Sequence, residues 1–296
     1  MSTNCCPAND GTANVNFNGG TLTANANQAS FMAGLSSATV QTNGARIDDG
    51  GFSIGISQNL LGDAAGDGGL TKQGLGTLLL NGINTYTNTT TVTAGTLGGN
   101  GYIAGPVVVQ ASGTLTAGAS IGTLHLLNNL TLAGNVFAEV NKSVSPSNDL
   151  VQVVGALINT GTGTVTVTNL GPALVVGDSF KLFSQPVLNG NALTVVSSGG
   201  VVWNNKLAVD GSVQVLSVSG AAKLPTGWGD AFARWQHLAH GDGSDRFDLQ
   251  VVGEYQCRVN TDHEYVDVIE QRDDHGQSVH HQRSDGDELS AALLSV

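Results

Sequence analysis

The most reactive-looking serine of this chain is Ser120, in the spelling Gly-Ala-Ser-Ile-Gly over residues 118–122. The pattern G-x-S-x-G is typical of a nucleophile elbow, where a serine between a strand and a helix attacks an acyl group with the help of Asp and His partners. The residues that follow, TLHLL, predict another strand rather than a helix. We therefore interpret Ser120 as a turn residue between two strands.

A second candidate nucleophile is Ser179, in the run Gly177-Asp178-Ser179. This spelling resembles the GDS opening of one class of esterases, whose serine needs a histidine partner. The following residues, FKLF, continue a strand pattern, and no histidine lies nearby in the sequence. We interpret the run as the start of a strand.

Carboxylates are the next residues that could do chemistry. Two acidic pairs precede residue 223, Asp48 with Asp49 and Asp63 with Asp67, and the nearest cations are Arg46 and Lys72. A β-helix lyase would need several carboxylates on one face to hold calcium, with a Lys or Arg as base. The run DAAGDGG at 63–69 is distantly similar to calcium-binding glycine repeats, but a single copy lacks the oxygen ligands that repetition supplies. We interpret both pairs as parts of solvated loops.

A third group of potential ligands is His275, His280 and His281, next to Asp273 and Asp274. Imidazole and carboxylate groups bind divalent metals when a fold fixes their geometry. A flexible tail provides no such geometry, so we interpret this group as a place for adventitious binding. The sequence thus assigns no catalytic, cofactor-binding or metal-binding residue, and it implies no cofactor.

The elements that would position these side chains are short strands. Thr, Leu and Val runs alternate with Gly or Asn about every eight to twelve residues, and Leu78 and Leu80 point to one side while Thr77 and Leu79 point to the other. We expect an irregular loop within 139–157, where Pro146 cannot donate to a strand ladder. The expected strands are 15–17, 20–24, 38–42, 52–56, 77–80, 90–93, 106–110, 113–117, 123–126, 130–133, 136–141, 150–154, 163–168, 179–183, 193–196, 206–209 and 212–218.

The segment 69–97 resembles the autotransporter-associated β-strand repeat, a pattern in which glycines, leucines and an Asn-Thr-Tyr turn recur in fixed register. The positions that fit are Gly69, Leu70, Lys72, Gly74, Gly76, Leu78, Leu80, Gly82, Asn84, Thr85, Tyr86, Thr89 or Thr90, Val92, Gly95 and Leu97. Asn88 departs from the usual glycine. Segments 113–134, 178–184 and 204–218 look like later strands of the same proteins, so the resemblance covers roughly residues 15–218. It implies an exported or surface structural segment without an active site.

Asn84, Thr85 and Tyr86 form the best-matched turn of this segment. We interpret them as an asparagine that bonds its own backbone and a tyrosine that caps a coil, with a ligand-binding role as the alternative.

Composition favours a solenoid over a compact sandwich. Only 5% of the chain is aromatic, and Gly-, Thr- and Asn-rich segments offer few large side chains to fill a thick core. Stacked coils need only a thin inner row of Val, Leu and Ile. We therefore predict an all-β, right-handed parallel β-helix (β-solenoid) over residues 1–222, with coils of about 20 residues and roughly ten coils in all.

Residues 223–296 differ from the first region and follow it as a short mixed or disordered C-terminal region. They hold 20 of the chain's 34 charged residues and six of its seven histidines. The spacing of Ala231, Phe232, Trp235 and Leu238 predicts a short amphipathic helix, which could cap the solenoid. The alternating run from 247 to 259 and the run YVDVIE predict a hairpin, and 271–288 is expected to be disordered. A frameshift or gene-calling artefact is the alternative explanation of this change.

The remaining signals concern compartment and partners. Cys5, Cys6 and Cys257 give no disulfide framework, and the sequence contains neither a secretory leader nor a transmembrane segment. We therefore expect a fragment of a longer passenger, or a protein exported by other means. A net charge of -12 without a basic stripe disfavours nucleic acid as a partner.

Three hypotheses follow. The leading one is a non-catalytic, monomeric structural segment of an autotransporter-like (type V secretion) passenger, extracellular or at the cell surface and associated with the outer membrane. The second is an adhesin or glycan-binding module, with host or matrix glycans or proteins as partners. The third is a β-helix polysaccharide lyase.

Overall fold

A computed structural model describes residues 12–197 and 199–218, together with the backbone of five strands beyond residue 232. The chain divides into two compact units, Met1–Gly220 and Ala221–Val296, and the sequence analysis placed this division two residues later. Among the described residues, no helix combines the length and the apolar character needed to cross a bilayer.

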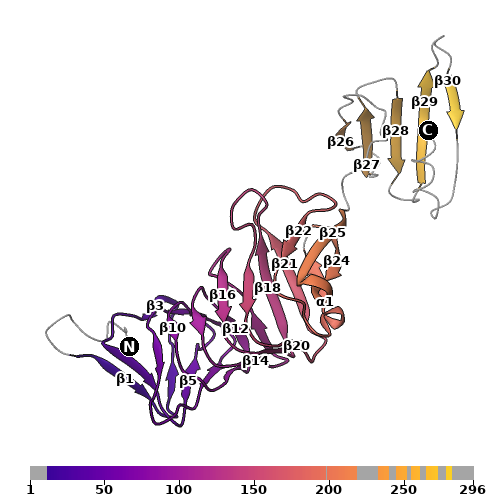
Figure 1. Ribbon diagram of the computed structural model, residues 1–296. Helices are drawn as coiled ribbons and strands as arrows, with labels where there is room; N and C mark the ends of the chain where they lie inside the picture. Colours follow the sequence, from indigo (N-terminus) through magenta and orange to yellow (C-terminus); the bar gives the residue numbers. More distant parts are fainter. Residues whose placement is uncertain are drawn as a thin grey trace. The chain divides into compact units, whose positions relative to one another are not determined.

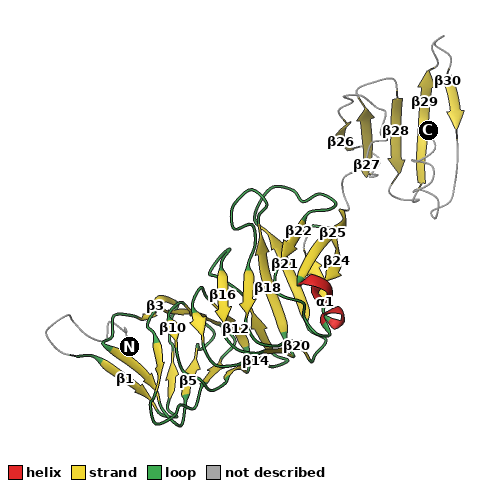
Figure 2. Cartoon of the chain, in the orientation of Figure 1, coloured by secondary structure: helices red, strands yellow, loops and turns green. Residues whose placement is uncertain are grey.

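The first unit is a three-sided parallel β-helix (Figures 1 and 2). Successive strands fall on the first, second and third side in turn, so each set of three forms one coil. The predicted parallel β-helix is therefore confirmed.

The strands of each side are as follows. The first side holds β1 (Asn14–Phe17), β4 (Ser37–Val40) and β7 (Leu60–Gly62) in one sheet and β10 (Ile83–Asn84), β13 (Tyr102–Ile103), β16 (Thr123–Leu126) and β19 (Leu150–Val153) in another. The second side holds β2 (Thr21–Thr23), β5 (Ala45–Asp48), β8 (Leu70–Gln73), β11 (Thr90–Val92), β14 (Val107–Val109), β17 (Leu130–Leu132) and β20 (Leu157–Asn159). The third side holds β3 (Gln28–Met32), β6 (Ser53–Ile56), β9 (Thr77–Leu80), β12 (Gly95–Gly98), β15 (Gly113–Leu115), β18 (Asn135–Val140), β21 (Thr164–Asn169) and β23 (Thr194–Ser197).

The core is a set of aliphatic columns that run along the inside of the coils. Alternation along each strand buries every second side chain, as Leu78 and Leu80 are buried while Thr77 and Leu79 are partly exposed. One column on the third side is Ile54, Leu78, Leu97, Leu115, Val136 and Val165, all in register and all buried. Because each coil buries only a few such residues, stability depends on the contacts between neighbouring coils.

Coil length varies more than the sequence analysis assumed. The chain advances 18 residues from Leu97 to its partner Leu115 but 30 from Val165 to its partner Val195. The third side therefore has eight strands, where coils of 20 residues had suggested ten. The extra length lies in loops, such as the one between Val140 and Leu150, which is shorter than the irregular segment 139–157 that was expected.

The last coil is closed by an antiparallel sheet that the sequence analysis did not foresee. It pairs β22 (Ser179–Lys181) with β25 (Ser212–Val218) and β25 with β24 (Val201–Lys206). Phe180 and Trp203 are buried there and meet edge to face, with ring centroids 6.3 Å apart. The 3-10 turn η1 (Gly190–Ala192) and the one-turn helix α1 (Leu207–Asp210) lie in the same segment.

The strand predicted over 206–209 is wrong, because α1 occupies Leu207–Asp210. The Asn205 side chain accepts a hydrogen bond from Leu207 N (2.9 Å), and Gly211 ends the turn in the left-handed region at φ 81°. These two local signals outweigh the strand propensity of the intervening Val209.

The second unit contains a five-stranded antiparallel sheet of β26 (Ala233–Ala239), β27 (Asp245–Val251), β28 (Tyr255–Asn260), β29 (Tyr265–Arg272) and β30 (Ser278–His281). The predicted amphipathic helix is wrong, because 233–239 pairs as a strand with β27. A helical spacing over one short window is weak evidence when a neighbouring strand can satisfy the backbone. Ala231 and Phe232, also part of that prediction, lie outside the described residues.

Two further predictions concern the second unit, a hairpin and a disordered segment. The hairpin is confirmed for β28 and β29, but the run 247–259 is divided between two antiparallel strands. Strand β30 and the end of β29 lie within the segment expected to be disordered, and 282–288 lies outside the described residues.

Tight coil corners require glycine where two backbones approach. A Cβ at Gly76 would overlap the backbone oxygen of Phe52 on the preceding coil, whereas a Cβ at Gly20 would meet nothing within 4 Å. We expect Gly76→Ala to lower the free energy of unfolding by about 2 kcal/mol or more, because backbone must move. Gly20→Ala should change it by less than about 0.5 kcal/mol. Equal urea midpoints for the two variants would contradict this packing.

Candidate functional site

Ser120 is an exposed residue in the loop between β15 and β16. The chain continues into strand β16 rather than into a helix, as the sequence analysis predicted. His125 is the one histidine whose side chain the structure describes, and its ring stacks on Tyr102 with centroids 4.2 Å apart. Among the described residues, Ser120 thus lacks the following helix of a nucleophile elbow, and His125 packs on Tyr102 instead.

Ser179 begins strand β22, also as predicted. The neighbouring Asp178 accepts hydrogen bonds from Val175 N (2.8 Å) and Lys142 Nζ (2.9 Å). Although burial acts in the opposite direction, these bonds hold the pKa of Asp178 below its usual value. The Asp178 carboxylate therefore fixes the turn at 175–178 that leads into strand β22.

Asp49 is not part of a solvated loop, which corrects the sequence interpretation, and it lies beside Lys72. Both side chains are fully buried at one corner of the solenoid, where Lys72 donates to Asp49 and to the backbone oxygens of Gln73 (3.1 Å) and Gly74 (2.9 Å). Asp49 also accepts from Gly51 N (2.8 Å) and Gly76 N (2.6 Å). Burial lowers the pKa of Lys72, and the nearby carboxylates oppose this shift only in part.

Asp67 has a similar structural role at another corner. Its carboxylate accepts from the backbone N–H groups of Gly69 (3.0 Å), Thr87 (2.7 Å) and Asn88 (2.9 Å), and from the Thr87 hydroxyl. Burial alone would raise the pKa of Asp67, but these hydrogen bonds lower it below the usual value. Four donors on one carboxylate leave little capacity for a calcium ion.

Within the Asn-Thr-Tyr turn, Asn84 and Tyr86 point inward, whereas Thr85 is exposed. Asn84 donates to Gly82 O (3.2 Å), as expected for a local bond, and it also donates to Tyr102 O (3.0 Å) and accepts from Leu60 N (3.2 Å). Tyr86 is fully buried with its hydroxyl 2.7 Å from Thr90 Oγ1, and burial raises its pKa. Asn84 thus connects neighbouring coils, the Tyr86 hydroxyl bonds within its own coil, and both side chains are buried away from solvent.

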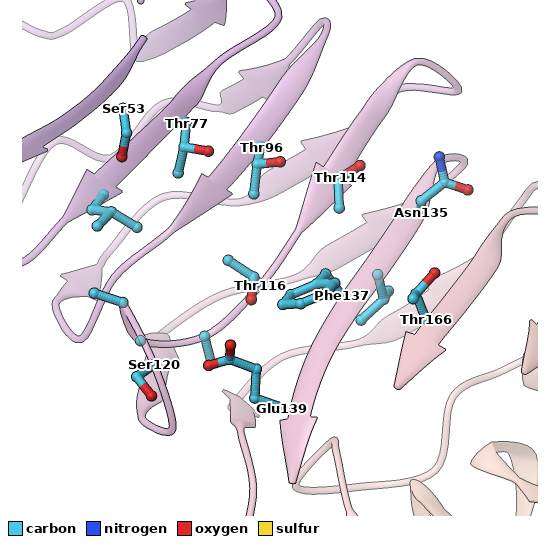
Figure 3. A pocket seen from close by; sticks show the side chains of 15 residues that line it. Ser53, Thr77, Thr96, Thr114, Thr116, Ser120, Asn135, Phe137, Glu139 and Thr166 are labelled. Atoms are coloured by element: carbon cyan, nitrogen blue, oxygen red, sulfur yellow. The ribbon is translucent and has the colours of Figure 1, made fainter. Parts of the chain in front are cut away.

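The outer face of the third side carries a hollow that the sequence analysis did not identify, with a volume of about 520 Å³. Figure 3 shows its upper row of side chains, Ser53, Thr77, Thr96, Thr114 and Asn135, which occupy equivalent positions on successive strands. We call this hollow the threonine groove. A recurrent threonine before each inward leucine was the signal in the sequence that could have revealed it.

A second row of residues borders the threonine groove, two residues further along the same strands. It contains Leu79, Gly98, Thr116 and Phe137, and the adjacent loop at 117–120 forms a wall. Glu139 lies beyond Phe137 on β18 and is the one ionisable side chain among the lining residues (Figure 3). The groove thus combines hydroxyl groups, one aromatic ring and one carboxylate.

Asp149 supports the strand that carries Glu139. It is buried, accepts from Gly122 N (2.9 Å) and Glu139 N (2.9 Å), and returns its own N–H to Glu139 O (2.9 Å). Burial raises the pKa of Asp149 to about 7, although the two hydrogen bonds oppose that shift.

The raised pKa predicts a pH-dependent stability. The pKa in the folded state exceeds the ordinary value of 3.8, so folding is favoured when the carboxyl is protonated, and this contribution is lost as pH rises from about 4 through about 7. We expect the melting temperature of the parent to fall, relative to Asp149→Asn, between pH 5 and pH 8. Parallel melting curves of parent and variant across this range would contradict the assignment.

Within the parts of the chain that the structure describes, no three His, Cys, Asp or Glu side chains gather in a metal-binding arrangement. His275 lies outside the described residues, as do Asp273 and Asp274. His280 and His281 fall in β30, of which only the backbone is described.

Comparison with known proteins supports the resemblance drawn from the sequence. A family model described as Passenger-associated-transport-repeat matches residues 70–98. Two curated proteins from Serratia marcescens, each named extracellular serine protease, are 33% identical over 153 residues and 31% identical over 157 residues. Each alignment covers 46% of this chain but 14% of the relative, so the chain corresponds to a small part of those proteins. No solved structure matches the chain significantly.

Proposed function

We propose that this chain, which carries one passenger-associated transport repeat, contributes a non-catalytic structural segment to an autotransporter-like passenger that is secreted or held at the cell surface. The repeat and the two extracellular relatives support the location. The observation that carries the structural role is the stack of coils, continuous along the second and third sides and closed by an antiparallel sheet.

The charged residues of the solenoid support this proposal. Asp49, Lys72 and Asp67 each form hydrogen bonds between neighbouring coils as well as within their own coil. Asp49 and Asp67, two of the four carboxylates considered for a lyase, are thus buried and hydrogen-bonded, which supports a structural role for them.

A serine-reactive probe tests the non-catalytic role. We expect the purified chain to remain unlabelled by a fluorophosphonate probe that labels trypsin in parallel, and Ser120→Ala to change the free energy of unfolding by less than about 0.5 kcal/mol. Labelling of the parent that Ser120→Ala abolishes would overturn the proposal. Location is tested by an impermeant biotinylation reagent on intact cells that make the natural protein, where labelling of this segment is expected.

A second candidate function is that of a glycan-binding module. The threonine groove favours it, because a hollow with hydroxyl groups and a partly exposed aromatic ring is the kind of surface on which polar ligands with apolar faces bind.

A further inference from the structure

We propose that the threonine groove binds a linear oligosaccharide that is neutral or carries amino groups. This inference rests on the second candidate function above and deepens it by naming the place on the molecule and the class of ligand.

The spacing of the upper row fits an extended sugar chain. Thr77, Thr96 and Thr114 are neighbours in register on adjacent parallel strands, so their hydroxyl groups recur at one strand spacing, about 4.8 Å. One pyranose unit of an extended chain has a similar length. Each hydroxyl donates and accepts, which matches the mixed donors and acceptors of a sugar.

The lower row supplies an apolar contact beside the hydroxyl groups. Leu79 and Phe137 are partly exposed, and the methyl group of Thr116 covers Gly98 between them, so that this row presents a largely apolar surface. The ring of Phe137 offers a flat apolar surface against which the C–H groups of a pyranose can pack. Sugars have both a polar edge and an apolar face, and the two rows present a complement to each.

Charge restricts the class of sugar. Glu139 is the one ionisable residue among those that line the groove, and no cation lines it. A uronate or sulfated chain would place its anions beside this carboxylate without any counterion from the protein. An amino sugar would place its ammonium groups beside Glu139, which favours binding.

An extended peptide is a poorer occupant. Strands β9, β12, β15 and β18 are each hydrogen-bonded to neighbours on both sides, so the groove offers no free backbone edge for strand addition. A peptide would therefore have to bind through side chains alone.

Calorimetry with defined hexamers tests the proposal on the full chain. The probes are a β-1,4-linked glucose hexamer, a glucosamine hexamer and a galacturonate hexamer. We expect the glucosamine hexamer to bind most tightly, the glucose hexamer more weakly, and the galacturonate hexamer not at all.

Three variants locate the site. Phe137→Ala should weaken binding of both ligands about tenfold, and Phe137→Leu, which keeps apolar volume but removes the ring, should have a similar effect. Glu139→Gln should weaken the glucosamine hexamer about fivefold and leave the glucose hexamer unchanged. Tyr102→Ala removes an exposed aromatic ring from the first side and is the matched control, expected to bind as the parent does.

The outcomes distinguish glycan binding by this chain from the location of the binding site in the threonine groove. Loss of binding in Tyr102→Ala but not in Phe137→Ala would keep the glycan-binding function and overturn the groove assignment. Tight binding of the galacturonate hexamer would overturn the ligand class. Failure of all three hexamers at millimolar concentration, with every variant folded by melting temperature, would overturn both.

Discussion

Leu80→Asp is expected to lower the free energy of unfolding by more than about 3 kcal/mol. Leu80 is fully buried in the inner column of the third side, in register with Ile56 on the preceding coil. A carboxylate at this position would lose its hydration and find no cation beside it. Because neighbouring coils stabilise one another, the damage should extend beyond one strand. Urea unfolding followed by circular dichroism measures the change.

Leu75→Asp is the matched control for Leu80→Asp. Leu75 is 82% exposed at the turn before β9, so the same exchange there should change stability by less than about 0.5 kcal/mol. If the two variants unfolded at the same urea concentration, Leu80 could not face the core, and the strand register would be displaced by one residue.

Lys72→Met is expected to cost about 3–5 kcal/mol, because it leaves the Asp49 carboxylate buried without its cation. Methionine fills similar volume but cannot donate to the backbone oxygens of Gln73 and Gly74. The double variant with Asp49→Asn removes the uncompensated charge and should regain part of the loss.

Lys181→Met separates this effect from the general loss of a lysine. Lys181 is exposed on β22, and the same exchange there should be nearly neutral. A melting temperature for Lys72→Met equal to that of Lys181→Met would show that the buried pair contributes little to stability. A double variant less stable than Lys72→Met would contradict the role given to Asp49.

The sequence predicted best those features that depend on local alternation. Thr77 to Leu80 alternate in exposure as expected, because period-two patterning and glycine turns act within one coil. Strand β8, in contrast, was not predicted, since a lysine at an inward position looks polar until Asp49, 23 residues earlier, is known to lie beside it. The pairing of distant residues determined its burial.

The candidate site could not be predicted for the same reason. Phe137 and Thr77 lie far apart in the chain and come to the same face only through the register of the intervening coils. The segment 233–239 was predicted wrongly for a related reason. Its side-chain spacing matched a helix, but pairing with β27 made it a strand. Local patterns do not report which segments become neighbours.

The most direct test of the parallel β-helix is a set of spin-label distances along one outer row. Along this row, one residue on each successive coil, lie Ser53, Thr77, Thr96, Thr114, Asn135, Thr164 and Thr194. Thr164 is therefore five strand spacings from Ser53, and Thr194 is six. With the native cysteines replaced by serine, one variant carries spin labels at residues 53 and 164 and a second variant carries them at residues 53 and 194. We expect label distances of about 24 Å in the first and about 29 Å in the second, a difference of one strand spacing. A Thr194 distance equal to or shorter than the Thr164 distance would contradict the stacked coils on which this account depends.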